Sequence, residues 1–243
     1  MDKNRNFSGK ITISYPWDLG EKISGPAVMF DVNAASHNIA YLTTITEALY
    51  VVDKYNVWKA LGIIPDAVLV GESSDRTLQE KFHTSNNASE VKKAELKGKK
   101  VILITNNGTH TLNELWEKGA DPIIVCDYAN LHTVSEWILK NCKREESITL
   151  VPAGGREEQY AKDPDLLEDL LCAQALEKLL RGGKPDFKSI FTKSREYIDA
   201  TNPQYWPTKE DDLDLIFTEK DLYKVVPICV RDKNRFLEIR NIQ

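Results

Sequence analysis

Hydrophobic residues in this chain gather in short runs that end on small polar residues. One such run, Val-Ile-Leu-Ile at residues 101–104, is followed by Thr-Asn-Asn-Gly-Thr at residues 105–109. An uninterrupted aliphatic run of this length is typical of a strand buried on both faces. The sequence predicts a turn in which Gly108 takes a positive φ and Thr109 caps a helix over about residues 111–118.

This turn is the first candidate binding site. A strand that feeds a helix through a short turn leaves backbone N–H groups unpaired and points the positive end of the helix dipole outward. Such a corner binds anions readily. An ordinary turn without a ligand has the same pattern, so the turn alone does not distinguish the two interpretations.

The other hydrophobic runs predict a layered α/β fold. Strands that alternate with helices favour a mixed, mostly parallel sheet flanked by helices. The sequence shows no internal repeat and no low-complexity linker, which favours a single domain over residues 1–243. The strands are expected at residues 10–15, 26–32, 50–53, 65–72, 121–126 and 147–152, and the helices at residues 36–48, 130–140, 165–180 and 186–205.

The pattern also predicts a C-terminal hairpin of residues 225–230 and 236–240, led into by residues 211–217. Pro227 lacks a backbone donor, so the first strand of this hairpin is expected at an edge of the sheet. Residues 73–94 are polar and are expected to form an irregular loop or a short helix lying over the sheet.

Four of the predicted strands end in a particular kind of polar group: Asp31, Glu72, the turn at residues 107–109, and Gly-Gly-Arg at residues 154–156. Ligands of open α/β sheets bind beyond the carboxyl ends of the strands. Acids, a backbone N–H cradle and a cation together suit a phosphate ester held with Mg²⁺. Asp31 could attack phosphorus or only hold the metal. The competing interpretation is that strands commonly end in polar loops.

The composition and the net charge argue against two classes of binding partner, nucleic acids and membranes. The net charge of −5 and the pI near 5.5 argue against nucleic acid as a partner, because no basic stripe would meet a phosphate backbone. No apolar run approaches the roughly 20 residues that span a bilayer, so no membrane partner is expected. The N-terminus lacks the apolar core of a signal peptide, and the 4 cysteines form no Cys-x-x-Cys pair. Reduced thiols and a cytoplasmic location are expected.

A set of short motifs runs in order from about residue 28 to residue 230. Taken together, these motifs resemble the 2-phosphosulfolactate phosphatase family. The motifs are Phe30-Asp31-Val32, Gly71-Glu72, Gly98-Lys99, Thr105-Asn106-Asn107-Gly108-Thr109, Asn130-Leu131, Ala153-Gly154-Gly155-Arg156, Glu168-Asp169 with Cys172-Ala173, and Asp221-Leu222-Tyr223 with Val226-Pro227.

The resemblance implies an α/β enzyme that hydrolyses a phosphate monoester on a small acidic carbon skeleton with Mg²⁺. The residues to which it assigns roles come from the ends of several predicted strands and from one helix start. They are Asp31, Glu72 and Asn107 for catalysis, Gly108, Thr109, Asn86 and Arg156 for substrate binding, and Asp31, Glu72, Glu168 and Asp169 for the metal.

Two motifs depart from the family pattern. The family follows its strand-end Asp-Val with Leu-Arg-Ala-Thr-Ser, whereas residues 33–37 here read Asn-Ala-Ala-Ser-His, so Ala34 replaces an arginine. Loss of one bidentate arginine contact costs a few kcal/mol of binding, for which His37 or Arg156 could compensate. The family's Asp-x-Gly-Asn-Ser-Pro loop appears as residues 83–88 and keeps only Asn86.

Three functions follow from these observations. The first is a Mg²⁺-dependent phosphatase of a small phosphate ester. The second, suggested by the altered motifs, is a catalytically altered or inactive homologue that binds a small anionic metabolite. The third is an interaction protein, in which the aromatic residues Tyr197, Tyr205 and Trp206 of the Pro-flanked tail form an interface, for example of a homodimer.

Overall fold

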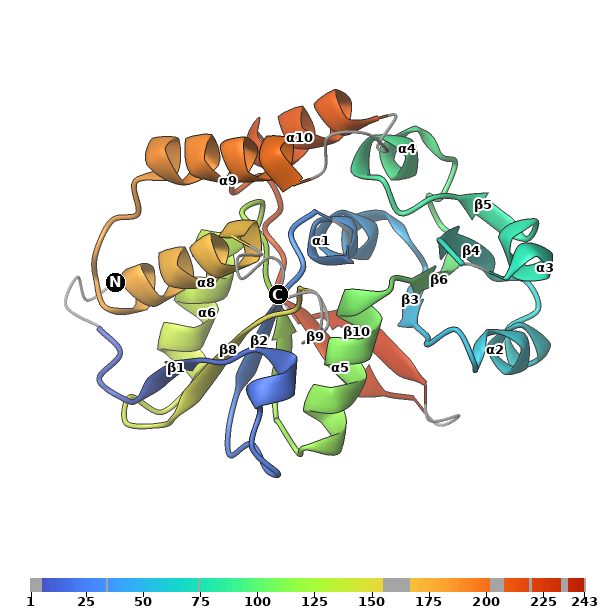
Figure 1. Cartoon of the computed structure of the whole chain (residues 1–243). Helices are drawn as coiled ribbons and strands as arrows, with labels where there is room; N and C mark the ends of the chain where they lie inside the picture. The colour runs from blue at the N-terminus through green and yellow to red at the C-terminus, as the bar shows by residue number, and fades with distance from the viewer. Residues whose placement is uncertain are drawn as a thin grey trace.

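The structure is a computed structural model that describes residues 6–33, 35–73, 75–154, 167–201, 208–218, 220–232 and 236–242. Its strands form a 10-stranded sheet in the order β1-β8-β2-β7-β9-β10-β3-β6-β4-β5 (Figure 1). The strands are β1 (Ile11–Ile13), β2 (Ala27–Phe30), β3 (Ala48–Val51), β4 (Val68–Gly71), β5 (Phe82–Thr84), β6 (Lys100–Ile104), β7 (Ile123–Val125), β8 (Ile148–Pro152), β9 (Pro227–Arg231) and β10 (Leu237–Asn241).

Helices connect these strands and cover the sheet. The predicted layered α/β fold is therefore confirmed. The helices are α1 (Ala35–Ile45), α2 (Val57–Ile63), α3 (Arg76–Gln79), α4 (Ala88–Lys93), α5 (Asn107–Glu117), α6 (Leu131–Asn141), α8 (Leu167–Leu180), α9 (Phe187–Thr201) and α10 (Lys209–Thr218), with a 3-10 turn at Pro16–Asp18.

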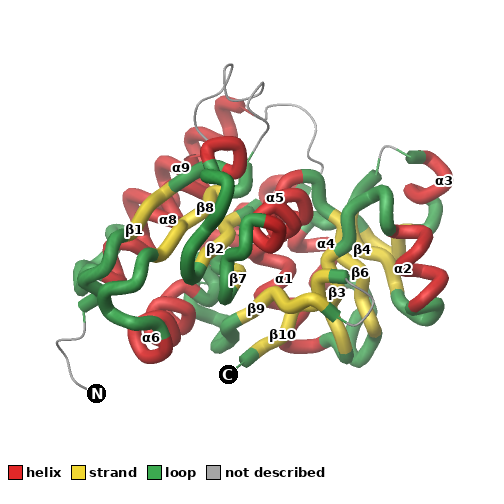
Figure 2. The backbone as a smooth tube through the Cα atoms, turned by 90° about the horizontal axis from the view of Figure 1, so that it is seen from below, coloured by secondary structure: helices red, strands yellow, loops and turns green. Residues whose placement is uncertain are grey.

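The sheet consists of two parallel sets joined by an antiparallel hairpin. The first set is β1, β8, β2 and β7, and the second set is β3, β6, β4 and β5. Between them, β9 runs antiparallel to β7, β10 to β9, and β3 to β10. Three successive reversals mean that the two sets run in opposite senses. Figure 2 shows them on either side of β9 and β10.

Alternating side chains along the strands build the layers. In β2, Ala27 and Met29 belong to the core cluster shared with α1 and α5, whereas Val28 and Phe30 belong to the cluster shared with α6 and α8. In β6, Val101 faces the α1 and α5 side. Helix α2 covers the opposite face of the second set. Helices α1 and α5 therefore lie where both sets can be reached, which is the position of the site described below.

One prediction about the sheet is wrong, and another is confirmed only in part because it missed a strand. The strand that contains Pro227 lies in the interior of the sheet, between β7 and β10. Pro227 is tolerated there because it is the first residue of β9, opposite Asn241 at the end of β10. The polar segment of residues 73–94 includes α3, α4 and the edge strand β5, which pairs with β4.

Two expectations from composition can be compared with the structure. All four cysteines, namely Cys126, Cys142, Cys172 and Cys229, are free thiols. Among the helices in the described part of the chain, none combines the length and the apolar character that crossing a membrane would need.

Candidate active site

Asp31 lies directly after β2 and is only 7% exposed. Its backbone N–H donates to Ser36 Oγ at 2.8 Å, and the Ser36 backbone N–H donates to the Asp31 carbonyl at 2.9 Å. This reciprocal pair closes the turn from β2 into α1. The turn therefore holds Asp31 at the carboxyl end of the first parallel set, as the strand-end pattern predicts.

Two helices begin at the Asp31 carboxylate. The backbone N–H groups of Ala35 in α1 and Gly108 in α5 both stabilise its charged form. Neither makes a well-aligned hydrogen bond with Asp31 Oδ2, which has no hydrogen-bond partner among the described residues. A carboxylate at two helix N-termini marks a place where negative charge is favoured.

Gly108 is required by close approach and not by a left-handed conformation. A Cβ on Gly108 would lie 2.5 Å from Asp31 Oδ2 and 2.5 Å from Ala35 Cβ. Both distances are shorter than side chains tolerate, so α5 can approach Asp31 only with glycine here. The predicted positive φ of Gly108 is wrong, because Gly108 lies within α5 and has an ordinary helical conformation.

The predicted cap of α5 is also wrong. The helix begins at Asn107, so Thr109 lies inside its first turn. Thr105 Oγ1 accepts the backbone N–H of Thr109 at 3.1 Å, and Thr109 Oγ1 accepts the backbone N–H of Thr105 at 3.0 Å. The end of β6 and the start of α5 are thus bonded to each other. The turn is rigid, and Thr109 supports it without being exposed.

The pKa of Asp31 is raised from its ordinary 3.8 to about 6. Burial is the main cause, because it removes water from the carboxylate. The N–H groups of Ala35 and Gly108 lower the pKa, and the negative charge of Glu72 raises it. Acids with such shifts cluster at functional sites.

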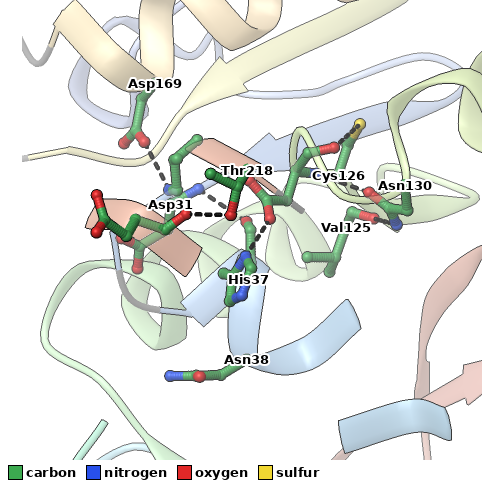
Figure 3. A network of polar contacts seen from close by, with 12 residues as sticks. Asp31, His37, Asn38, Val125, Cys126, Asn130, Asp169 and Thr218 are labelled. Carbon is green, nitrogen blue, oxygen red and sulfur yellow. Dashed lines mark hydrogen bonds and ion pairs between the residues drawn. The ribbon is translucent and has the colours of Figure 1, made fainter. Parts of the chain in front are cut away.

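Two acids from the first turn of α8 lie against the Asp31 loop. Asp169 Oδ1 accepts the backbone N–H of Val32 at 2.7 Å (Figure 3). Glu168 Oε1 accepts the side-chain amide of Asn33 at 2.6 Å. Glu168 is 5% exposed and Asp169 is 2% exposed. Burial raises the pKa of Asp169 well above its ordinary value, and the charges of Glu168 and Asp31 raise it further.

A histidine–carboxylate pair lies beside this cluster. His37 Nδ1, in the first turns of α1, is 2.7 Å from Asp127 Oδ2, and both side chains are almost fully buried (Figure 3). Asp127 follows β7, and its backbone N–H donates to Asn130 Oδ1 at 2.8 Å. Asn130 in turn donates to the carbonyls of Val125 and Val225. The pair fixes α1 to the end of β7.

The second parallel set contributes exposed polar groups. Glu72, which follows β4, is exposed, and its Oε1 accepts the Asn106 side-chain amide at 2.8 Å. Asn107, the first residue of α5, is half-buried. Glu72 bonds to Asn106 and acts on Asp31 through its negative charge.

Asn86 is buried beside α1. Its backbone carbonyl accepts the side-chain amide of Asn38 at 2.6 Å, and Asn86 itself is 8% exposed. The loop that carries Asn86 is thereby attached to the helix that begins at Asp31. Arg156 and Ala34 lie outside the described residues.

The structure therefore brings together most of the residues assigned from the sequence. Glu168 and Asp169 bond to the loop that carries Asp31, and Gly108 lies against the Asp31 carboxylate. Thr109 supports the turn from β6 into α5, which begins at Asn107, and Glu72 bonds to Asn106 of the same turn. Sequence reasoning missed Asp127. The signal was present, because Asp127 follows an apolar run just as Asp31 does.

The carboxylates around Asp31 are possible ligands for Mg²⁺. The described residues contain no group of three His, Cys, Asp or Glu side chains that could hold a metal ion. Mg²⁺ usually needs only one or two carboxylates, with water and substrate phosphate oxygens completing its coordination. A buried Asp31 Oδ2 without a hydrogen-bond partner among these residues fits that mode of binding.

Known proteins are similar to this chain over most of its length. A probable 2-phosphosulfolactate phosphatase of Thermotoga maritima is 28% identical over 219 residues, covering 84% of this chain and 88% of the relative. The 2-phosphosulfolactate phosphatase of Methanocaldococcus jannaschii is 28% identical over 238 residues, covering 90% and 95%. The sequence profile of the 2-phosphosulpholactate phosphatase family matches residues 16–204. The chain therefore belongs to this family of phosphatases.

Proposed function

We propose that this chain is a Mg²⁺-dependent phosphatase that hydrolyses a small acidic phosphate monoester such as 2-phosphosulfolactate. The substrate follows the names of its relatives. The observation that carries the chemistry is the buried Asp31 carboxylate, on which the N-termini of α1 and α5 converge.

The protein's own groups account for binding and orientation. The phosphate would lie at the starts of α1 and α5, where backbone N–H groups and helix dipoles favour its charge. Mg²⁺, when bound by Asp31 with Glu168, Asp169 or Glu72, would neutralise charge on the phosphate oxygens. Asp169 accepts the Val32 backbone N–H and Ser36 accepts the Asp31 backbone N–H, so the backbone that carries the Asp31 carboxylate is held on both sides.

The two roles of Asp31 differ in whether a covalent intermediate forms. If Asp31 attacks phosphorus, its oxygen forms a bond to phosphorus, the bond to the leaving alkoxide breaks, and water then releases phosphate. A trapped acyl phosphate at Asp31, or ¹⁸O in its carboxyl group after a single turnover in ¹⁸O-labelled water, would identify the nucleophilic role. Label in the released phosphate is expected for both roles.

The test is phosphate release from a panel of small esters, 2-phosphosulfolactate and 2-phospholactate among them. We expect turnover with Mg²⁺, loss of turnover with EDTA, and recovery when Mg²⁺ is restored. Absence of turnover with every ester would refute the proposal. Tight binding of an ester without turnover would support the alternative of an altered homologue that binds a small anionic metabolite.

A homodimer remains part of this proposal. Trp206 and Tyr205, the aromatic residues expected at its interface, lie outside the described residues. Sedimentation of the wild type and of Trp206→Ala would test it, because a dimer built on this tail should dissociate in the variant.

A further inference from the structure

The loop that carries Asn86 is held from both of its sides by distant parts of the chain. On one side Asn38 in α1 donates to the Asn86 carbonyl at 2.6 Å. On the other side Asp212 in α10 accepts the backbone N–H of Ser89 through Oδ1 at 2.7 Å. Asp212 is fully buried and lies 123 residues from Ser89 in the sequence.

Helix α4 lacks a cap of its own. Asn87 occupies the N-cap position of α4 but makes no side-chain hydrogen bond to it. The helix has only 6 residues, which is too short to be stable without tertiary contacts. Asp212 supplies the missing acceptor from another helix. This contact holds the first turn of α4, and Ser85 Oγ, which accepts the Asn87 N–H at 3.0 Å, holds the residue before it. Both contacts help to place Asn86.

The Asp212 carboxylate is held in this orientation. Thr208 Oγ1 donates to Asp212 Oδ2 at 2.6 Å, and the Asp212 backbone N–H donates to the Thr208 carbonyl at 2.9 Å. One carboxylate oxygen is thus bonded within the start of α10, and the other is left to face α4.

In Figure 1, α9 lies above α8, and α10 lies beside α4 at the top of the view. Helix α9 packs on α8, which carries Glu168 and Asp169, and α10 packs on α4. Arg195 in α9 pairs with Glu210 and Asp214 in α10. Helices α9 and α10 therefore contact the helix that carries these two acids and the helix that follows Asn86.

We propose that Asp212 is a positioning residue of the active site, which acts through the first turn of α4 to hold Asn86 where the substrate binds. This inference rests on the proposed function, because it takes Asn86 as a substrate-binding residue. Asp212 does not itself touch the substrate. Its loss should weaken substrate binding more than it slows the chemical step.

Asp211 provides a matched control. It is the neighbouring acid on the same helix and pairs with Lys93 of the same α4 at 3.3 Å, but both side chains are exposed. Exposed pairs contribute little, so Asp211→Ala should leave KM and kcat unchanged. Asp212→Ala should raise KM by about five- to tenfold, the range expected for a lost cap, with kcat nearly unchanged. Hydrogen exchange at Ser89 should become faster only in Asp212→Ala.

A double-mutant cycle with Asn86→Ala distinguishes positioning from general destabilisation. If Asp212 acts through Asn86, Asp212→Ala should add less than about twofold to KM in the Asn86→Ala background. If the two substitutions raise KM independently, so that their factors multiply in the double variant, the proposal is overturned. It is also overturned if KM is unchanged in Asp212→Ala although hydrogen exchange at Ser89 is faster. If Asp212→Ala does not fold, Ser89→Pro, which removes the N–H that Asp212 accepts, takes its place in the same cycle.

The two proposals can fail separately. If the wild type hydrolyses no ester, the proposed function fails, and the dissociation constant of inorganic phosphate replaces KM in the cycle. Non-additive effects on phosphate binding would still support positioning by Asp212. Additive effects, or no effect of Asn86→Ala on phosphate binding, would overturn it.

Discussion

Asp31 and Asp53 both follow parallel strands, but their surroundings differ. Asp53, beyond β3 of the second set, accepts hydrogen bonds from Tyr55 and Asn56 of its own turn. Asp31, beyond β2 of the first set, is buried and meets helix starts and acids from distant segments. An acid at the end of a strand therefore stabilises only its own turn unless other elements pack around it and exclude water.

The same contrast holds between the two parallel sets as wholes. Ends of the first set carry the buried acids Asp31 and Asp127, with Asp169 packed against them. Ends of the second set carry exposed groups such as Glu72 and Asn106. The first set therefore carries the buried acids, and the second set supplies the backbone donors of α5 and exposed side chains.

The largest expected effect is on catalysis. Asp31→Asn should lower kcat/KM by about 10³-fold or more, roughly 4 kcal/mol, because it removes the charge around which the site is built. Asp53→Asn, at the corresponding end of the second set, should keep kcat/KM within about threefold of the wild type. Phosphate-release assays of the two variants make the comparison directly. Equal losses of kcat/KM in the two variants would show that Asp31 contributes no more to catalysis than another acid at a strand end.

The second effect is on the free energy of unfolding. His37→Leu should destabilise the protein by about 3–5 kcal/mol, because it leaves the Asp127 carboxylate buried without its partner. Urea denaturation measures this loss. His110→Leu, at an exposed position of α5, is the control and should change stability by less than about 0.5 kcal/mol. A small loss in His37→Leu would show that the pair does not hold α1 to β7.

A third effect concerns pH. The unfolded chain ionises Asp31 near 3.8, whereas the folded chain keeps the proton up to about 6. Stability should therefore fall as pH rises through this window, by about 3 kcal/mol from this group. In EDTA, Asp31→Asn should be more stable than the wild type at pH 7.5, and the advantage should shrink towards pH 4. An advantage that is independent of pH would contradict the raised pKa.

The fourth effect tests the close approach of α5. Gly108→Ala should cost about 1–3 kcal/mol of stability and lower activity, because its Cβ meets Asp31 and Ala35. Gly62→Ala is the matched control, because a Cβ there, in α2, meets nothing within 4 Å. It should be neutral or stabilising by up to about 1 kcal/mol. If Gly108→Ala leaves stability unchanged, the starts of α1 and α5 are farther apart than the structure shows.

The smallest effect is expected at the exposed side of the site. Glu72→Gln removes a charge that raises the pKa of Asp31, so that pKa should fall slightly. The change in kcat/KM should stay within about fivefold, because Glu72 is exposed and its field is screened by water. A larger loss, seen only with Mg²⁺ present, would show that Glu72 is a metal ligand.

Local patterns were sufficient to predict most elements of the fold. The aliphatic run of β6 and the alternation of apolar and polar residues along the helices gave their positions to within a few residues. Predictions failed where the outcome depended on neighbours. Pro227 reads as an edge residue, yet its place at the start of β9 lets the strand lie inside the sheet. Thr109 reads as a cap, yet Thr105 accepts its N–H.

In the candidate site, too, some residues could be predicted from local sequence and others could not. Asp31 and Glu72 could be selected from the sequence because each follows an apolar run, and Glu168 and Asp169 because they match the motifs of the family. Asp127 also follows an apolar run, but its pairing with His37 could not be predicted, because the two residues lie far apart in the sequence. The contact of Asp212 with Ser89 could not be predicted for the same reason.

The sequence by itself determined the elements of this protein, their order, its family and the acids at its strand ends, because periodicity and turn chemistry are local properties. Only the tertiary structure decided that the two parallel sets run in opposite senses and that α1 and α5 begin at the same carboxylate. Burial and mutual repulsion then set the ionisation of Asp31 and Asp169. These are properties of the assembled groups, since water is excluded and charges come together only when distant segments pack.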